Sequence, residues 1–168
     1  MSTDLVLAAS EAIPTAFVAP DMTLLLSKAI ESVTDPHPDT GTPRTFPWLV
    51  QHEAREAGGV LRFAATPVPE AHLRAWVMPI LVQAAVATGK SRTDEEVETW
   101  LAALQLGVGH LEVGAFTLET QRQALNSIKF FPFVADIYDI VAGHAVKIRT
   151  TFDALKRIVR APTTQGAA

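Results

Sequence analysis

The clearest structural signal in the sequence is the stretch TDEEVETWLAALQLGV, residues 93–108. Thr93 and Glu96 have the spacing of a capping box, in which each side chain accepts a hydrogen bond from the other residue's backbone N–H at the start of a helix. Trp100 follows one turn later. Apolar residues recur around it every three or four positions, at Val97, Leu101, Leu104 and Val108. The stretch therefore predicts an amphipathic helix that buries one face.

Upstream of this helix the sequence predicts three others. The first begins at an N-cap on Asp21, runs from Met22 to about Ile30, and ends in the turn-rich segment 35–43. A short second helix is expected over 47–56, stopped by Gly58-Gly59, with residues 60–64 forming a short strand or part of a loop. The third starts after Pro67 and Pro69 and ends at Gly89. Pro79 lies inside it and either kinks it or marks a second start.

Downstream, Thr117 is expected to cap a helix that has Thr120 at its third position and is broken by Pro132. A final long helix is expected from about Phe133 to Val159. The fold class predicted from these patterns is all-α: a single-domain helical bundle of about five or six helices.

The length of 168 residues suits one domain. Residues 1–20 contain two prolines and no clear period, so we expect a flexible N-terminal arm. Residues 21–160 form the predicted helical domain. Residues 161–168 are expected to be a short, frayed and disordered C-terminal tail.

The composition limits the chemistry. There are no cysteines, which excludes disulfides, thiolate nucleophiles and cysteine zinc sites. The first basic residue is Lys28, so the N-terminus lacks the positive region of a signal peptide, and the apolar stretches are too short to span a membrane. We therefore expect a cytoplasmic protein, in the host cytoplasm if a phage encodes it, with no membrane association.

The sequence contains no complete motif of an enzyme active site. The segment AAVATGKS, residues 84–91, formally fits a relaxed nucleotide P-loop, but it offers only Gly89 for close approach to phosphate and its alanines favour helix. We interpret Gly89 as a glycine that ends a helix, followed by a polar loop. The five histidines form no metal-binding pair, and no G-x-S-x-G elbow is present. We expect no enzyme activity and assign no catalytic, cofactor-binding or metal-binding residue.

The charge is unevenly distributed. Residues 1–140 hold 9 basic and 17 acidic side chains, whereas residues 141–168 hold 5 basic and 1 acidic. The basic residues of the C-terminal segment are Lys147, Arg149, Lys156, Arg157 and Arg160. Its apolar stripe is Ile148, Phe152, Leu155 and Val159. One interpretation is an ordinary amphipathic helix with cations that favour its C-terminal dipole. The other is a helix that docks in a partner groove or contacts DNA phosphates weakly.

The segment KFFPFVADI, residues 129–137, carries three aromatics around Pro132. Because proline disfavours helix at the residue before it, the chain must turn here between two helices. The phenylalanines either pin one helix to the next inside the core or form part of a binding surface.

The order of features over residues 93–137 resembles the helical domain of phage-type replicative helicase loaders, which include the lambda P-like proteins and the loader-and-inhibitor proteins of Gram-positive phages. The matching features are Trp100 in an acidic helix, the following helix over 117–128, and the aromatic-Pro-x-x-Ala-acidic-Ile step from Phe131 to Ile137. Asp136 stands where that family usually has glutamate. Residues 1–92 match no family pattern.

The resemblance implies a non-enzymatic phage or prophage adaptor that binds a DnaB-type hexameric helicase by helix-in-groove contact. The residues expected to bind the partner are Phe131, Pro132, Asp136, Lys147, Arg149, Phe152, Lys156, Arg157 and Arg160. The alternative is a phage structural or virion-assembly protein, such as a tail-assembly or head-completion component. A small DNA-binding regulator is a third interpretation, disfavoured by the acidic body.

Overall fold

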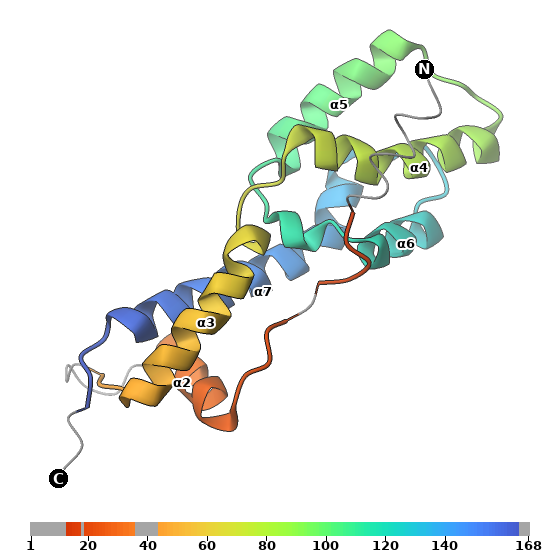
Figure 1. Ribbon diagram of the computed structural model, residues 1–168. Helices are drawn as coiled ribbons and strands as arrows, with labels where there is room; N and C mark the ends of the chain where they lie inside the picture. Colours follow the sequence, from red (N-terminus) through yellow and green to blue (C-terminus); the bar gives the residue numbers. More distant parts are fainter. Residues whose placement is uncertain (1–12, 18, 36–43, 165–168) are drawn as a thin grey trace. The chain divides into compact units, whose positions relative to one another are not determined.

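The computed structural model, shown in Figure 1, consists of helices joined by turns and loops over the residues that it describes. It describes residues 13–17, 19–35 and 44–164. The α-helices in this part of the chain are α2 (Leu24–Thr34), α3 (Trp48–Ala64), α4 (Glu70–Thr88), α5 (Asp94–Val108), α6 (Leu118–Ser127) and α7 (Val134–Arg160). A short 3-10 helix, η1 (Val113–Ala115), lies between α5 and α6. No strand occurs among these residues, so the predicted all-α class is confirmed.

The single domain consists of two compact units. Unit 1 is formed by Met1–Phe17 and Thr66–Val146, and unit 2 by Val18–Ala65 and Lys147–Ala168. Helix α7 contributes its first half to unit 1 and its second half to unit 2.

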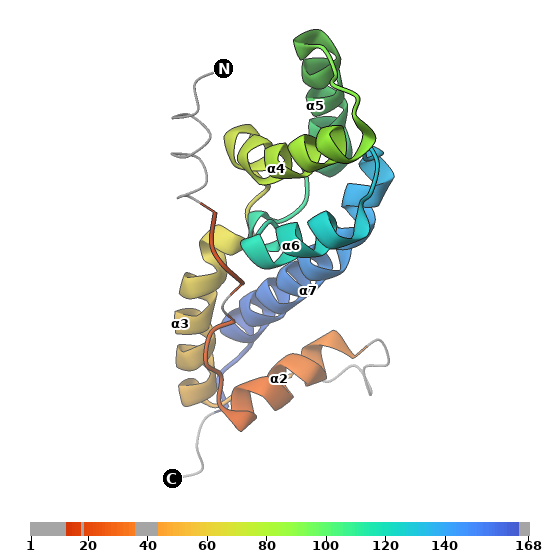
Figure 2. The same cartoon turned by 90° about the vertical axis from the view of Figure 1, so that its right-hand side faces the viewer.

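In unit 1, helices α4 and α6 lie side by side, as both views show (Figures 1 and 2). The indole Nε1–H of the fully buried Trp76 donates to the carbonyl of Thr117 at 2.8 Å, and the Gln121 amide donates to the carbonyl of Trp76 at 2.6 Å. Phe116 packs edge-on against the Trp76 ring, with centroids 5.5 Å apart. These contacts satisfy buried polar groups and fix the start of α6 against the middle of α4.

The predicted helix ends in unit 1 agree with the structure. Both capping boxes are formed, at Thr93 with Glu96 and at Thr117 with Thr120. Gly89 ends α4 in the left-handed conformation, with φ 63°, which glycine adopts without a Cβ penalty. Pro79 lies inside α4, which is assigned as one helix from Glu70 to Thr88 rather than as two.

The described part of the N-terminal arm predicted over 1–20 makes contacts in unit 1. The carbonyls of Pro14 and Thr15 accept hydrogen bonds from the backbone N–H groups of Leu118 and Glu119, at 2.9 and 3.0 Å. Ile13 is buried. Because the first N–H groups of a helix have no partner within the helix, this segment supplies their acceptors and is held in place. The rest of the predicted arm, 1–12 and 18, lies outside the described residues.

In unit 2, the start of α2 also differs from the prediction. The N-cap is Thr23, not Asp21, because the Thr23 hydroxyl accepts from the Leu26 N–H at 3.2 Å. The Glu53 carboxylate of α3 accepts from the backbone N–H and the hydroxyl of Thr23, at 2.6 and 2.8 Å. This tertiary contact selects the cap residue. Of the predicted turn 35–43, residues 36–43 lie outside the described residues.

The prediction that Gly58-Gly59 ends the second helix is wrong. Helix α3 continues through both glycines to Ala64, so residues 60–64 are helical rather than strand or loop. Its buried side chains are Val50, Gln51, Ala54, Ala57 and Leu61. This face continues past the glycines, and its burial outweighs their cost of about 1 kcal/mol each relative to alanine.

The described part of the predicted C-terminal tail, residues 161–164, makes hydrogen bonds with Phe46 and Gln51. The Phe46 N–H donates to the Pro162 carbonyl at 3.1 Å, and the Thr164 N–H donates to the Phe46 carbonyl at 3.0 Å. The Gln51 amide bridges the carbonyl of Ala161, at 2.8 Å, and the hydroxyl of Thr163, at 3.0 Å. Residues 165–168 lie outside the described part of the chain.

Candidate protein-docking site

Residues 130–133, Phe-Phe-Pro-Phe, form a turn between α6 and α7 that we name the aromatic corner. Helix α6 ends at Ser127 because Ile128 adopts an extended conformation, with φ −93° and ψ 111°. Pro132 has no N–H to donate and disfavours helix at Phe131. The Asp136 carboxylate then accepts from the Phe133 N–H at 2.7 Å and caps the start of α7. Local chemistry thus fixes both ends of the corner.

The inner side of the corner is held against α5. The Trp100 indole N–H donates to the carbonyl of the buried Pro132 at 3.0 Å. The rings of Trp100 and Phe131 meet edge-to-face, with centroids 5.5 Å apart and planes at 70°. The Arg92 guanidinium lies 4.9 Å from the Phe131 ring centroid, within the range of a cation–π contact. Both expected corner residues, Phe131 and Pro132, therefore anchor the corner.

The outer side is exposed. Phe130 and Phe133 are 72% and 76% exposed. Two clefts adjoin them, both within unit 1. The first, which we name the α5 cleft, has a volume of about 630 Å³ and is lined by residues 131–134 together with Arg92, Glu95, Glu96, Thr99, Trp100 and Ala103. The second, the α7 cleft, has about 430 Å³ and includes Lys129, Phe130, Phe133, Asp136 and Asp139.

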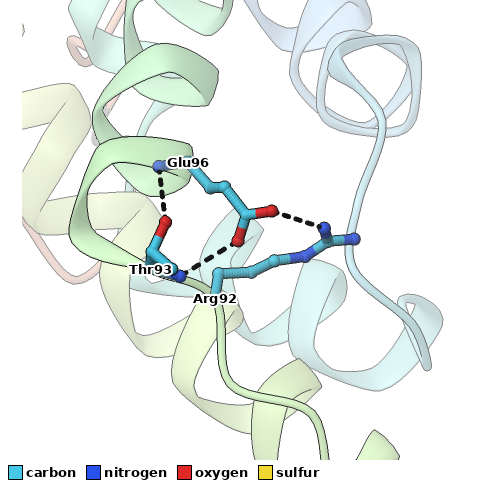
Figure 3. Close-up of polar contacts among 3 residues, drawn as sticks. All are labelled: Arg92, Thr93 and Glu96. Carbon is cyan, nitrogen blue, oxygen red and sulfur yellow. Dashed lines mark hydrogen bonds and ion pairs between the residues drawn. The ribbon is translucent and has the colours of Figure 1, made fainter.

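Polar contacts at the start of α5 hold Arg92 and Glu96, two residues that line the α5 cleft (Figure 3). The Glu96 carboxylate accepts from the Thr93 backbone N–H at 3.0 Å and pairs with the Arg92 guanidinium at 3.4 Å. The Thr93 hydroxyl accepts in return from the Glu96 N–H at 3.2 Å. The hydrogen bond from the Thr93 N–H, followed by the charge of Arg92, lowers the pKa of Glu96 from its ordinary value. The carboxylate is thus ionised at neutral pH and helps to hold Arg92 beside Phe131.

The rims of the clefts are acidic. Glu95 and Glu96 line the α5 cleft, and Asp136 and Asp139 line the α7 cleft. Arg92 and Lys129 are the cations among the lining residues. The aromatic surface is therefore bordered by more negative than positive charge.

The basic residues expected to bind the partner do not lie at this corner. Lys147, Arg149, Phe152, Lys156, Arg157 and Arg160 belong to the half of α7 in unit 2. The Lys156 ammonium pairs with Asp153 at 3.3 Å and lies 4.2 Å from the Phe152 ring centroid. The Arg157 guanidinium donates to the Val33 carbonyl at 3.1 Å. Lys156 and Arg157 therefore already make contacts within unit 2.

The apolar stripe of that helix half is largely part of the core. Ile148 and Leu155 are 2% and 1% exposed, and Phe152 and Val159 are half-buried. The exposed face of α7 in unit 2 is therefore the charged one.

The P-loop-like segment ends a helix, as predicted. Residues 84–88 form the last turn of α4, and Gly89 is its C-cap. The C-terminal end of a helix presents carbonyl groups and partial negative charge, which disfavour phosphate.

The histidines and carboxylates that the structure describes do not form a metal site. Among residues 13–17, 19–35 and 44–164, no three His, Asp or Glu side chains are arranged to hold a metal ion. His72 donates from Nε2 to the Phe116 carbonyl at 2.8 Å, which is a packing role. No helix in the described ranges has both the length and the apolar character needed to cross a membrane.

The sequence interpretation missed a second exposed apolar surface, in unit 2. Trp48 and Phe63 of α3 are 64% and 71% exposed, and Leu49 and Val60 are 62% and 64% exposed. All four lie on α3 away from its buried face, so helical periodicity applied to this segment would have separated the two stripes.

Comparison with known proteins adds no relative: no family model, no curated protein and no solved structure matches the chain. The class of protein is therefore defined by the fold and the geometry alone. It is an all-α protein whose aromatic corner is held by α5 and bordered by acidic side chains.

Proposed function

We propose that this chain is a protein-binding adaptor without catalytic activity, and that its docking surface is the aromatic corner with its two clefts. The observation that carries the proposal is the contrast between the two sides of the corner. Phe131 and Pro132 are anchored by Trp100, while Phe130 and Phe133 remain more than two-thirds exposed. Exposed apolar side chains that gather in one patch are characteristic of interaction sites.

The energies involved suit such a role. Burying an exposed phenylalanine side chain contributes about 1.5–3 kcal/mol, so two rings supply roughly 3–6 kcal/mol. Micromolar affinity corresponds to about 8 kcal/mol, so the rings supply a large part of it. Because the Trp100 hydrogen bond and the Arg92 contact already order the corner, binding costs little conformational entropy there.

The partner that we propose is a DnaB-type hexameric replicative helicase. The support is the resemblance of residues 93–137 to phage helicase loaders, because that range contains α5, α6 and the whole corner. The alternative identity, a virion-assembly protein, uses the same surface for a different partner, so one experiment addresses both.

The test is site-specific photo-crosslinking of the full chain. A photoreactive phenylalanine analogue replaces Phe133 in one sample and Phe63 in a control, since Phe63 is similarly exposed, at 71%, but lies in unit 2. Each sample is incubated with purified bacterial replicative helicase and, separately, with phage-infected lysate. We expect crosslinks to the helicase from position 133 and not from position 63.

Binding measurements complete the test. The double variant Phe130→Ala/Phe133→Ala should lose at least about tenfold in affinity for the helicase, because 1.4 kcal/mol corresponds to a factor of ten. The control Phe63→Ala should leave the affinity unchanged. Crosslinks from position 133 to virion proteins would instead identify the chain as a virion-assembly protein and refute the helicase-loader role. Equal capture by the double variant and the wild type would refute the docking role of the corner.

A further inference from the structure

We infer that the segment received by the aromatic corner is a basic amphipathic helix, with apolar side chains entering the α5 cleft and lysine or arginine side chains meeting the acidic rims. This inference rests on the proposed docking function and goes beyond it by naming the chemistry of the partner.

The lining of the α5 cleft favours apolar side chains of the partner. Trp100, Ala103, Pro132 and Val134 line it with mainly apolar atoms. Its volume of about 630 Å³ lies within the roughly 300–1,000 Å³ range of ligand pockets, so it has room for more than one apolar side chain. A helix presents such side chains three or four residues apart on one face, which is the pattern used in helix-in-groove recognition.

The acidic rims favour basic side chains of the partner. Arg92 is engaged by Glu96, at 3.4 Å, and by the Phe131 ring, at 4.9 Å. Within the described part of the chain, no salt bridge pairs Glu95 or Asp139. Both carboxylates are exposed beside exposed phenylalanines. They attract cations during encounter and disfavour an acidic competitor, whereas each exposed pair contributes only about 0.2–1 kcal/mol.

The same charges argue against nucleic acid at this surface. Phosphate contacts supply most of the affinity of proteins for DNA, and they require lysine or arginine. Arg92 is held in contacts within the chain. The other cation, Lys129, lines the α7 cleft together with the acidic side chains of Asp136 and Asp139. The corner therefore favours a basic protein segment over DNA.

The tryptophans of the chain provide site-specific reporters of binding. Each of its three tryptophans gives one indole N–H signal in a ¹H–¹⁵N spectrum, and Trp→Phe variants assign the signals. Trp100 lies in the α5 cleft, Trp76 is buried in unit 1, and Trp48 lies on the exposed surface of α3. The probes are two synthetic helical peptides with the same leucine stripe, one with lysine and one with glutamate at every polar position.

We expect the lysine peptide to shift the Trp100 signal saturably and to leave the Trp48 signal in place. The glutamate peptide should bind about tenfold more weakly, since two rim pairs at about 0.7 kcal/mol each amount to about 1.4 kcal/mol. The double variant Glu95→Gln/Asp139→Asn should remove most of this preference. Raising the salt from 0.05 to 0.5 M should reduce it in the wild type, because screening weakens exposed pairs.

Each contrary outcome has a distinct meaning. Equal affinity for the two peptides would refute the basic partner while leaving the docking role intact. The basic partner would also be refuted, and the docking role kept, if neither peptide shifts the Trp100 signal although Phe130→Ala/Phe133→Ala abolishes helicase binding. Shifts of the Trp48 signal alone would move docking to the α3 surface and overturn both the inference and the proposed function.

Discussion

Replacing Trp100 by phenylalanine tests whether the aromatic corner is anchored as described. The substitution keeps an aromatic ring but removes the indole N–H that donates to the Pro132 carbonyl at 3.0 Å. Pro132 is buried, so water does not readily replace the lost donor. The phenyl ring is also smaller and loses part of the edge-to-face contact with Phe131, now at 5.5 Å between centroids.

The magnitude follows from these losses. A net hydrogen bond contributes about 0.5–1.5 kcal/mol, and leaving a buried acceptor without a donor costs about 1–3 kcal/mol. Because Trp100 is only half-buried, we expect the free energy of unfolding to fall by about 2 kcal/mol. With an m-value of about 2 kcal/mol per molar urea, the unfolding midpoint moves down by about 1 M.

The assay is urea unfolding followed by far-ultraviolet circular dichroism, which does not depend on tryptophan emission. The matched control is Trp48→Phe, because Trp48 is 64% exposed and its substitution should change stability by less than about 0.5 kcal/mol. If Trp100→Phe shifts the midpoint no further than Trp48→Phe does, the hydrogen bond to Pro132 does not anchor the corner.

Three other substitutions test particular contacts. A Cβ on Gly107 would overlap the Val134 side chain. Gly107→Ala should therefore lower the free energy of unfolding by about 1 kcal/mol, even after the gain in helix propensity. In a Val134→Ala background the same substitution should be neutral or stabilising, and the midpoints of urea unfolding will show the difference. Arg74 donates to the Glu98 carboxylate and lowers the Glu98 pKa, so this pair stabilises above the unfolded glutamate pKa and the effect is lost as the pH falls through the depressed folded value. Arg74→Met should therefore raise the Glu98 pKa toward its ordinary 4.5 in a ¹³C carboxyl titration; an unchanged pKa would count against the pair. Gln51→Leu removes the hydrogen bonds to Ala161 and Thr163 and should speed tryptic cleavage after Arg160, the basic residue that precedes this segment. An unchanged rate would mean that Gln51 does not hold the segment.

Helix starts were predictable where the signal lies within a few residues. The capping box at Thr93 and the N-cap at Thr117 both form as predicted, and the structure shows that Thr120 completes a second box with Thr117. The start of α2 was not predictable in this way. Asp21 and Thr23 are both good N-caps, and the choice depends on Glu53, 30 residues further along the chain than Thr23.

The error at Gly58-Gly59 has a related cause. Glycine lowers helix propensity locally, but Ala57 and Leu61 on either side of the pair lie on the buried face of α3. Packing outweighs propensity when the buried face continues past the weak residues. The tail at 161–164 was likewise unpredictable, because its partners Phe46 and Gln51 are more than 100 residues away in the sequence.

The candidate site shows the same division between local and long-range information. The proline and three phenylalanines predict a turn with aromatics, and this part of the prediction agrees with the structure. Which ring points where depends on α5, since Trp100 and Arg92 hold Phe131 and leave Phe130 and Phe133 exposed. The basic C-terminal residues looked equally suited to binding in the sequence. Their helix uses its apolar stripe in the core, so the exposed aromatics provide the stronger basis for docking.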